Sequence, residues 1–317
     1  MGFNKIDRVL KIYDKLISGD IVNKKELATE FDVNLRTIQR DIDDIRNYLS
    51  DNYETENILY DHKCNGYYLD SNKKNILSTV EIFSIIKIIL ESRAFCREEM
   101  HGIISSIFAY VPKLESKTIK SLILNELYHF QEISHKKPIL KMIWDLGQCI
   151  LKKEVIEIEF TKSDGEKSRR AIYPLSIVFS EFYFYVVAKI EDSKYSQPAF
   201  FRVDRIEKFK LLNKKYVLNR FEEGELKKRV MFMYGGDLMK IKFKYTGKSI
   251  EHIIDRFPIA KIIDIDEDVY EFEVEVYGKG CLMWLLSQGE NIELIEPENL
   301  REELIEKINK MSKIYSK

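Results

Sequence analysis

Few residues of this chain can form disulfides or metal sites. The 317 residues include four cysteines and five histidines, and no two cysteines form a CxxC pair. Zinc ribbons and disulfide frameworks depend on closely spaced pairs of such residues. We therefore expect no metal, no cofactor and no disulfide, as is usual for a protein of a reducing cytoplasm.

Long apolar runs and net charge are also lacking. The longest apolar run, Ile82 to Leu90, is interrupted by Lys87 and is too short to cross a membrane. The first residues carry charges throughout, so we expect no signal peptide and a cytoplasmic protein. Lys and Arg number 51 and Asp and Glu 52, which leaves a net charge of −1. A nucleic-acid surface would therefore have to be local.

Sequence motifs of catalytic residues are lacking as well. The chain contains no HExxH and no GxSxG motif. Gly247-Lys248-Ser249 matches the end of a phosphate-binding loop, but the earlier glycine of that motif is replaced by Lys242. We therefore expect a protein that is not an enzyme.

The most informative stretch is Lys24 to Leu49, which predicts two helices joined by a tight turn. The first helix covers Lys24–Phe31, the turn is Asp32-Val33-Asn34, and the second helix begins near Leu35. Apolar residues of the second helix recur at the three-and-four spacing of one buried face. They are Leu35, Ile38, Ile42, Ile45 and Leu49. This is the layout of a helix-turn-helix with a recognition helix.

Polar side chains begin the second helix and point away from its apolar face. Asn34 is predicted as the N-cap, and Arg36, Thr37, Gln39 and Arg40 face outward. Such side chains bind base edges and phosphates of duplex DNA. Periodicity alone equally allows a solvated face on an ordinary helical hairpin.

A hairpin signal follows the helices. Asn57–Asp61 and Tyr67–Asp70 flank a turn that contains Asn65-Gly66, which is typical of a β-hairpin. A hairpin in this place is the wing of a winged helix, so Lys63 at its tip could reach a phosphate. The alternative for the tip is a solvated turn.

The charge of this region predicts how it binds. Residues 1–50 contain nine basic and nine acidic side chains. One such region should bind DNA weakly and with a steep dependence on salt. We therefore expect a homodimer that presents two recognition helices to two half-sites.

The rest of the chain predicts three further domains after the winged helix-turn-helix of residues 1–72. A polar linker, Ser71 to Asn75, precedes a helical connector and dimerisation region over residues 73–136. Residues 137–230 contain a leading helix, with Trp144 and Cys149 expected in the core, and then short strands. Residues 231–317 follow the order β-α-β-β-α-β-α of a ferredoxin-like sandwich. The fold class is therefore α+β and multidomain.

The short strands of residues 154–209 predict a small, strongly bent sheet or barrel. Aromatic and basic residues interleave in these strands, as in surfaces that bind single-stranded nucleic acid or a nucleotide. A barrel core with charges outside is the alternative. We favour the core for Phe184 and Phe201, but not for Arg202 and Arg205, whose anionic partner could simply be Asp204 or Glu207.

Three segments in the expected order resemble WYL-domain transcriptional regulators. Residues 33–45 (VNLRTIQRDIDDI) are similar to the helix-turn-helix of that family. Residues 174–188 (PLSIVFSEFYFYVVA) with 201–206 (FRVDRI) are similar to the WYL domain, and residues 281–315 to its C-terminal extension. Where the family name implies Trp-Tyr-Leu, this chain has Phe184-Tyr185-Val186.

The resemblance implies a bacterial dimeric regulator whose WYL domain is an Sm-like barrel that senses a ligand, in some members a nucleic acid or nucleotide. Tyr185 matches the central tyrosine of the family, and Arg202 and Arg205 match its arginine-containing motif. Arg169 or Arg170 matches a basic position before Pro174-Leu175. These residues are the predicted effector site, and operator DNA is the predicted partner.

Two other classes remain open at this stage. One is a nucleic-acid-associated enzyme or accessory factor, for example in phage defence, that binds single strands through the barrel. The other is a structural adaptor whose helix-turn-helix no longer binds DNA.

Overall fold

The computed structural model describes residues 4–17, 19–52, 56–71, 77–111, 113–191, 197–217 and 221–316. The chain divides into two compact units, residues 1–83 with 110–115 and residues 84–109 with 116–317. The predicted linker lies outside the described residues except for Ser71. None of the helices in the described ranges is long and apolar enough to cross a membrane.

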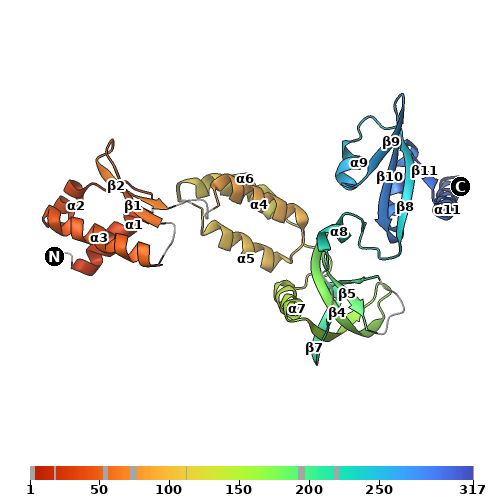
Figure 1. The fold of residues 1–317 in the computed structure, drawn as a ribbon, viewed down its shortest axis with the longest axis horizontal. Helices are drawn as coiled ribbons and strands as arrows, with labels where there is room; N and C mark the ends of the chain where they lie inside the picture. The colour runs from red at the N-terminus through yellow and green to blue at the C-terminus, as the bar shows by residue number, and fades with distance from the viewer. Residues whose placement is uncertain are drawn as a thin grey trace. The chain divides into compact units, whose positions relative to one another are not determined.

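Three helices and a hairpin make up most of the first unit (Figure 1). They are α1 (Lys5–Ile17), α2 (Lys24–Phe31), α3 (Leu35–Asn52), β1 (Glu56–Asp61) and β2 (Gly66–Ser71). The two strands pair antiparallel, with Asp61 opposite Gly66 at the turn. The predicted helix-turn-helix and the hairpin after it are therefore both present as secondary structure.

The apolar face predicted for the second helix packs into the core of the first unit. Ile38, Ile42, Ile45 and Leu49 are buried there. Leu35 differs from the prediction, because 48% of it is exposed. It occupies the first position of α3, where a side chain leans towards the N-terminal end and past the packed turns.

The turn between α2 and α3 has the geometry of a helix C-terminus. Asp32 adopts a left-handed backbone with φ 53°. The N–H of Val33 donates to the carbonyl of Ala28 at 3.0 Å, and the N–H of Asp32 donates to Thr29 at 3.4 Å. These bonds satisfy carbonyls that the end of α2 leaves free. They also set the direction in which α3 starts.

The segment before α2 pairs with the hairpin. Val22 and Tyr67 exchange two backbone hydrogen bonds of 2.8 Å each. A Cβ at Gly66 would lie 2.5 Å from the side chain of Ile21 and 3.1 Å from the carbonyl of Val22. Glycine at position 66 therefore allows the two backbones to approach, and the hairpin is tied to the entry of α2.

Helices follow the hairpin, as predicted for residues 73–136. They are α4 (Thr79–Ser92), α5 (Arg97–Phe108) and α6 (Lys113–Tyr128). The helical character predicted for this region is therefore observed. The role of this region as a dimerisation element stays a prediction.

The next region is a helix followed by an antiparallel sheet. They are α7 (Leu140–Lys152), β3 (Glu154–Thr161), β4 (Lys167–Ser180), β5 (Tyr183–Ile190), β6 (Ala199–Arg202), the 3₁₀ turn η2 (Val203–Arg205) and β7 (Ile206–Lys215). The strand order is β6-β5-β4-β3-β7. The predicted closed barrel is not observed, because β6 and β7 are the two edges and no ladder joins them within the described residues.

Helix α7 covers one face of this sheet. Leu146 and Cys149 pack on Ile156, Ile158 and their neighbours, together with Phe201 and the partly buried Phe184. These placements confirm the predictions for Cys149, Phe184 and Phe201. The prediction for Trp144 is wrong, since 68% of it is exposed. Trp144 lies two residues before Leu146, which puts it on the opposite side of the helix.

The C-terminal region has the predicted order of elements. After α8 (Glu223–Lys227) they are β8 (Leu238–Tyr245), α9 (Glu251–Arg256), β9 (Lys261–Asp266), β10 (Val269–Tyr277), η3 (Gly278–Gly280), α10 (Cys281–Ser287), η4 (Gly289–Asn291), β11 (Ile292–Glu296) and α11 (Glu298–Tyr315). The strands form an antiparallel sheet in the order β11-β8-β10-β9.

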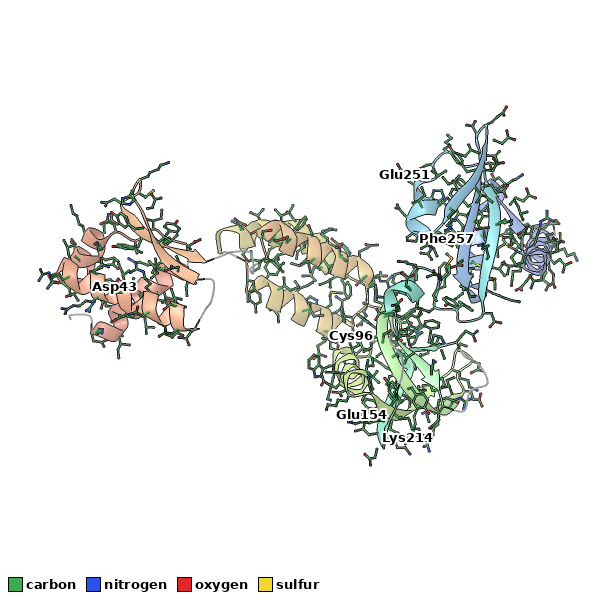
Figure 2. The ribbon with its side chains drawn as sticks, in the orientation of Figure 1. Asp43, Cys96, Glu154, Lys214, Glu251 and Phe257 are labelled. Carbon is green, nitrogen blue, oxygen red and sulfur yellow. The ribbon has the colours of Figure 1, made fainter. Side chains whose placement is uncertain are left out.

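The core of the C-terminal region is aromatic. Phe257, labelled in Figure 2, is 1% exposed and meets Trp284 edge-to-face at a centroid distance of 4.7 Å. Phe243 stacks on Phe272 at 5.4 Å.

Gly278, with φ 63°, is needed where two backbones cross, because a Cβ there would lie 2.4 Å from the carbonyl oxygen of Gly235.

Candidate nucleic-acid interface and effector site

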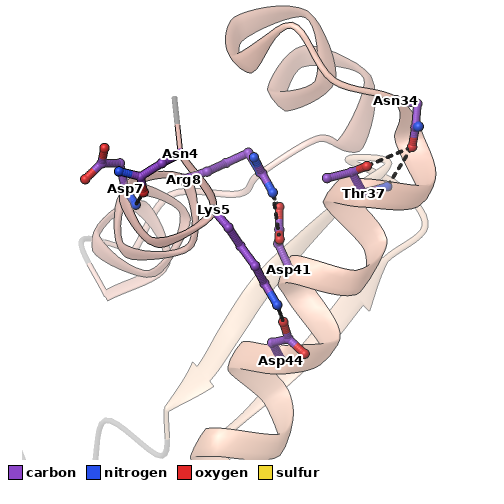
Figure 3. Close-up of polar contacts among 8 residues, drawn as sticks. All are labelled: Asn4, Lys5, Asp7, Arg8, Asn34, Thr37, Asp41 and Asp44. Carbon is purple, nitrogen blue, oxygen red and sulfur yellow. Dashed lines mark hydrogen bonds and ion pairs between the residues drawn. The ribbon is translucent and has the colours of Figure 1, made fainter. Parts of the chain in front are cut away.

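Helix α3 starts with a side-chain cap. The backbone N–H of Thr37 donates to Oδ1 of Asn34 at 2.8 Å, and the hydroxyl of Thr37 donates to the same oxygen at 3.0 Å (Figure 3). The predicted N-cap role of Asn34 is therefore confirmed. These bonds fix the first turn of the helix, where the predicted DNA-contacting side chains begin.

Arg36 and Arg40 lie on one face of the first turns of α3, and both are exposed. Within the described parts of the chain, no carboxylate pairs with either guanidinium. Two such groups, four residues apart on a helix, project side by side. Their donors are available to phosphates or to the acceptors of guanine.

Gln39 is held inside the unit. Its Oε1 accepts from Nζ of Lys24 at 2.9 Å and from the hydroxyl of Tyr67 at 3.0 Å. Its Nε2 donates to Asp43 at 3.0 Å. Gln39 therefore joins α3 to the start of α2 and to the hairpin. Sequence reasoning missed Lys24 and Tyr67, which come from segments far from α3.

A buried ion pair lies behind the recognition face. Nε of Arg8 donates to Asp41 at 2.5 Å and Nη2 donates at 3.2 Å, and the side chains are 8% and 1% exposed (Figure 3). The hydrogen bond to Asp41 raises the pKa of Arg8. The pair joins α1 to α3 next to Arg40. The signal in the sequence is Asp41 itself, a charge three residues after Ile38 on a buried face.

Two further acidic groups of α3, Asp43 and Asp44, have basic partners. Asp44 pairs with Lys5 at 2.9 Å (Figure 3), and Asp43 pairs with Arg46 at 2.6 Å. Asp43, labelled in Figure 2, lies one turn after Gln39 and also accepts from its Nε2 at 3.0 Å. These pairs reduce the negative charge that a phosphate would meet beyond Arg40.

The tip of the hairpin is shaped by Asp61. Its Oδ1 accepts from the backbone N–H of Lys63 at 2.7 Å and of Cys64 at 3.3 Å. These hydrogen bonds, the one from Lys63 first, lower the pKa of Asp61. The side chains of Lys63 and Cys64 are exposed at the tip. The turn therefore presents an ammonium group and a thiol on a fixed loop.

Tyr185 and Arg202 of the predicted effector site face each other across β5 and β6. The guanidinium of Arg202 donates to both oxygens of Asp204, at 3.0 and 2.8 Å, and its Cζ lies 3.3 Å from the centre of the Tyr183 ring. The anionic partner of Arg202 is thus Asp204, as one reading of the sequence allowed. Tyr183 was missed, although it shares a strand face with Tyr185.

The environment of this cluster is half-buried. Burial raises the pKa of Tyr185, while the charges of Arg202 and Arg205 oppose that rise. Arg205 is half-buried in η2 and has no carboxylate partner among the described residues. Tyr185, Arg202 and Arg205 are therefore brought into one neighbourhood, where a phenol and two guanidinium groups could hold an anion.

Arg169 and Arg170 are not brought into that cluster. Arg169 pairs with Glu159 at 2.7 Å, which also pairs with Lys208 at 3.2 Å. Arg170 donates to the carbonyl of Arg169. No hydrogen bond, ion pair or ring contact in the described ranges links either arginine to Arg202. Arg169 belongs to a charged ladder with Glu159 on β3 and Lys208 on β7, whereas Arg170 lies opposite Ile158.

A family model for the WYL domain matches residues 142–211. The chain therefore contains a WYL domain. A WCX domain, the C-terminal extension of WYL domains, matches residues 237–312. The WYL domain thus includes α7, the sheet and the cluster around Arg202, and the WCX domain includes the C-terminal sheet.

Two solved structures are similar to the chain, each at 15% sequence identity. Proteasome accessory factor B/C (PafBC) of Arthrobacter aurescens covers 94% of this chain with a TM-score of 0.33. This chain spans 47% of that one, about half its length. A CRISPR Cas-related protein covers 77% of this chain, which spans 76% of it, with a TM-score of 0.40. Among curated proteins no match was found.

Proposed function

We propose that this WYL-domain protein is a dimeric, DNA-binding transcriptional regulator whose WYL domain senses an anionic effector. The observation that carries the DNA-binding part is the pair Arg36 and Arg40, exposed and without a carboxylate partner in the described chain, at the capped start of α3. The other features of the first unit that we invoke position this pair or extend the contact surface beside it.

The contact surface has three parts. Arg36 and Arg40 read base edges or phosphates in the major groove, and Thr37 contacts the backbone beside them. Lys63 at the hairpin tip reaches a phosphate. Asn34 and Gln39, predicted as contacts, act mainly by fixing the helix, since their side-chain oxygens accept hydrogen bonds within the unit.

The effector part of the proposal rests on the cluster of Tyr185, Arg202 and Arg205. An anionic group, such as the phosphate of a nucleotide or a single-stranded nucleic acid, would bind the guanidinium groups. Asp204 already occupies two donors of Arg202, so the effector either replaces Asp204 or uses the remaining donors. Arg169 and Arg170 would contribute only to a longer ligand that extends over the sheet.

A binding selection from random duplex DNA tests the proposal. The wild-type protein should enrich one sequence, and the Arg36→Ala, Arg40→Ala double variant should enrich none. Repeating the selection with short single-stranded oligonucleotides tests the effector. If the wild-type protein enriches no duplex sequence, the structural adaptor is favoured. If it binds single strands only, the accessory factor is favoured.

A further inference from the structure

Helix α7 begins without a cap of its own. Its N-cap residue is Ile139, which has no side-chain oxygen, and Pro138 precedes it. The cap comes instead from α5, because Oε1 of Glu99 accepts from the backbone N–H of Ile139 and of Leu140, each at 2.8 Å. A carboxylate at this place meets the free N–H groups and the positive end of the helix dipole. Glu99 therefore ties α5 to the first turn of the WYL domain's leading helix.

The residue before Pro138 is tied to the arginine cluster. Nζ of Lys137 donates to the backbone carbonyl of Asp204 at 2.9 Å, and the N–H of Lys137 donates to Nδ1 of His135 at 2.9 Å. Only Pro138, whose ring fixes its φ, separates Lys137 from the capped residue Ile139. A shift of Asp204 would therefore move the first turn of α7, and the reverse also holds.

Asp204 is held from two sides. Its carbonyl accepts from Lys137, and its carboxylate accepts the two hydrogen bonds of Arg202. Hydrogen bonds thus connect Arg202 to Asp204 and Asp204 to Lys137, and the backbone from Lys137 to Ile139 leads on to Glu99. Burial lowers the pKa of His135, and the charges of Asp204, Arg202, Lys137 and Glu99 all act on that ring. These groups therefore share one neighbourhood.

The second oxygen of Glu99 marks this contact as unusual. Oε2 is buried and has no hydrogen-bond partner in the described part of the chain. A buried carboxylate oxygen without a partner destabilises the fold. Glu99 therefore keeps a second buried acceptor beside the first turn of α7.

We propose that Glu99 and Lys137 are positioning residues of the effector site, which fix Asp204 against Arg202 and carry a displacement of Arg202 to helix α5. The positioning role concerns the protein without effector. The transmission role rests on the proposed function of the WYL domain. Two experiments separate these parts.

Hydrogen exchange of the free, full-length protein tests positioning. Glu99→Ala should speed exchange of the Ile139 and Leu140 amides and also of a peptide covering residues 202–206, by about tenfold, as expected for loss of charge-assisted hydrogen bonds. Lys137→Ala should affect residues 202–206 similarly. Glu99→Gln, which keeps the acceptor, should resemble wild type, and so should Glu98→Ala, the exposed neighbour on α5. Faster exchange at 139–140 with no change at 202–206 would overturn the proposal.

Tryptophan emission tests transmission. Trp144 is exposed one turn after Leu140, and Trp284→Phe leaves it as the single tryptophan. The probe is a 5′-phosphorylated oligothymidylate of about six nucleotides, with inorganic phosphate as the second arm. Binding should shift the Trp144 emission in Glu98→Ala and Glu99→Gln but not in Lys137→Ala, which lacks the link from Asp204 to α7 and should still bind the probe. An unchanged shift in Lys137→Ala would overturn transmission. A wild-type protein that binds neither probe would contradict the proposed effector chemistry and leave the exchange result to decide positioning.

Discussion

Two arginine–aspartate pairs of this chain have the same hydrogen-bond pattern but different surroundings. Arg8 lies on α1 and Asp41 lies on α3, 33 residues later in the sequence, and their side chains are 8% and 1% exposed. Arg202 and Asp204 are two residues apart at the edge of a sheet, 18% and 5% exposed, with Tyr183 stacked on the guanidinium.

The two pairs differ in whether an anionic ligand could take the place of the aspartate. The Arg8 pair is enclosed by α1 and α3, so no ligand can reach it without unfolding the unit. The Arg202 pair depends on a local turn, and its arginine still has donors that Asp204 does not use. The same hydrogen-bond geometry therefore stabilises the first unit. In the WYL domain it suits an arginine that exchanges Asp204 for another anion.

Asp41→Ala gives the largest expected effect. It leaves Arg8 buried and charged, which costs about 3–5 kcal/mol of unfolding free energy. Chemical denaturation followed by circular dichroism should show an early transition of the first unit. Asp44→Ala is the matched control, because it removes only the exposed pair with Lys5 and should cause no measurable change. Equal stability of the two variants would contradict a structural role for the buried pair.

Arg36→Ala and Arg40→Ala extend the comparison to arginines that have no acidic partner. Each should weaken binding to the selected operator by about 1–3 kcal/mol if it reads bases. The stability of the protein should not change, since both side chains are exposed. Fluorescence anisotropy at several salt concentrations measures the affinity, and a phosphate contact would lower the salt slope by about 0.9. An operator affinity that does not change in the double variant would exclude this face as the DNA contact.

Asp204→Asn tests whether the second pair can exchange. Without the carboxylate, Arg202 should bind the phosphorylated oligothymidylate more tightly, on the order of tenfold, because it no longer has an internal anion. Glu207→Gln changes the net charge equally three residues away and serves as control. Weaker binding by Asp204→Asn than by Glu207→Gln would mean that Asp204 orients Arg202 for the ligand and does not compete with it.

The smallest effect is expected at the hairpin tip. The negative charge of the Asp61 carboxylate raises the pKa of the exposed Cys64 thiol above its usual value of 9.0. Less thiolate is then present at pH 8, so alkylation should be slower than for a cysteine in a short peptide and should accelerate as the pH rises. Asp61→Asn should speed the reaction at pH 8. Mass spectrometry can follow it, and bound operator DNA should protect Cys64 if Lys63 touches a phosphate.

Much of the fold could be predicted from periodicity. The face of α3 from Ile38 to Leu49, the β-α-β-β-α-β-α order of the C-terminal region and the cap at Asn34 depend on local spacing, and all are observed. The exposure of Trp144 could not be read in this way. A large aromatic residue is usually buried, and only the packing of Leu146 and Cys149 decides which side of α7 faces the sheet.

The candidate site was predicted where its residues lie close in sequence. Arg202 and Asp204 are two residues apart, and the family resemblance indicates Tyr185, which pairs with Arg202 across β5 and β6. Arg8 with Asp41 and Glu99 with Ile139 join segments 33 and 40 residues apart, and nothing in a single sequence specifies such contacts. Arg169 and Arg170 show the converse, since adjacency to a family motif did not bring them to the cluster.

If α3 is the recognition helix that we propose, the three hydrogen bonds of Gln39 bear on any attempt to redesign its specificity. Residue 39 lies among the side chains that one would replace to recognise a new operator, but its amide also connects Lys24, Tyr67 and Asp43. Transplanting another recognition helix onto this scaffold would break those bonds. Positions 24, 39 and 67 should therefore be exchanged as a set, so that a grafted helix keeps its angle to the hairpin.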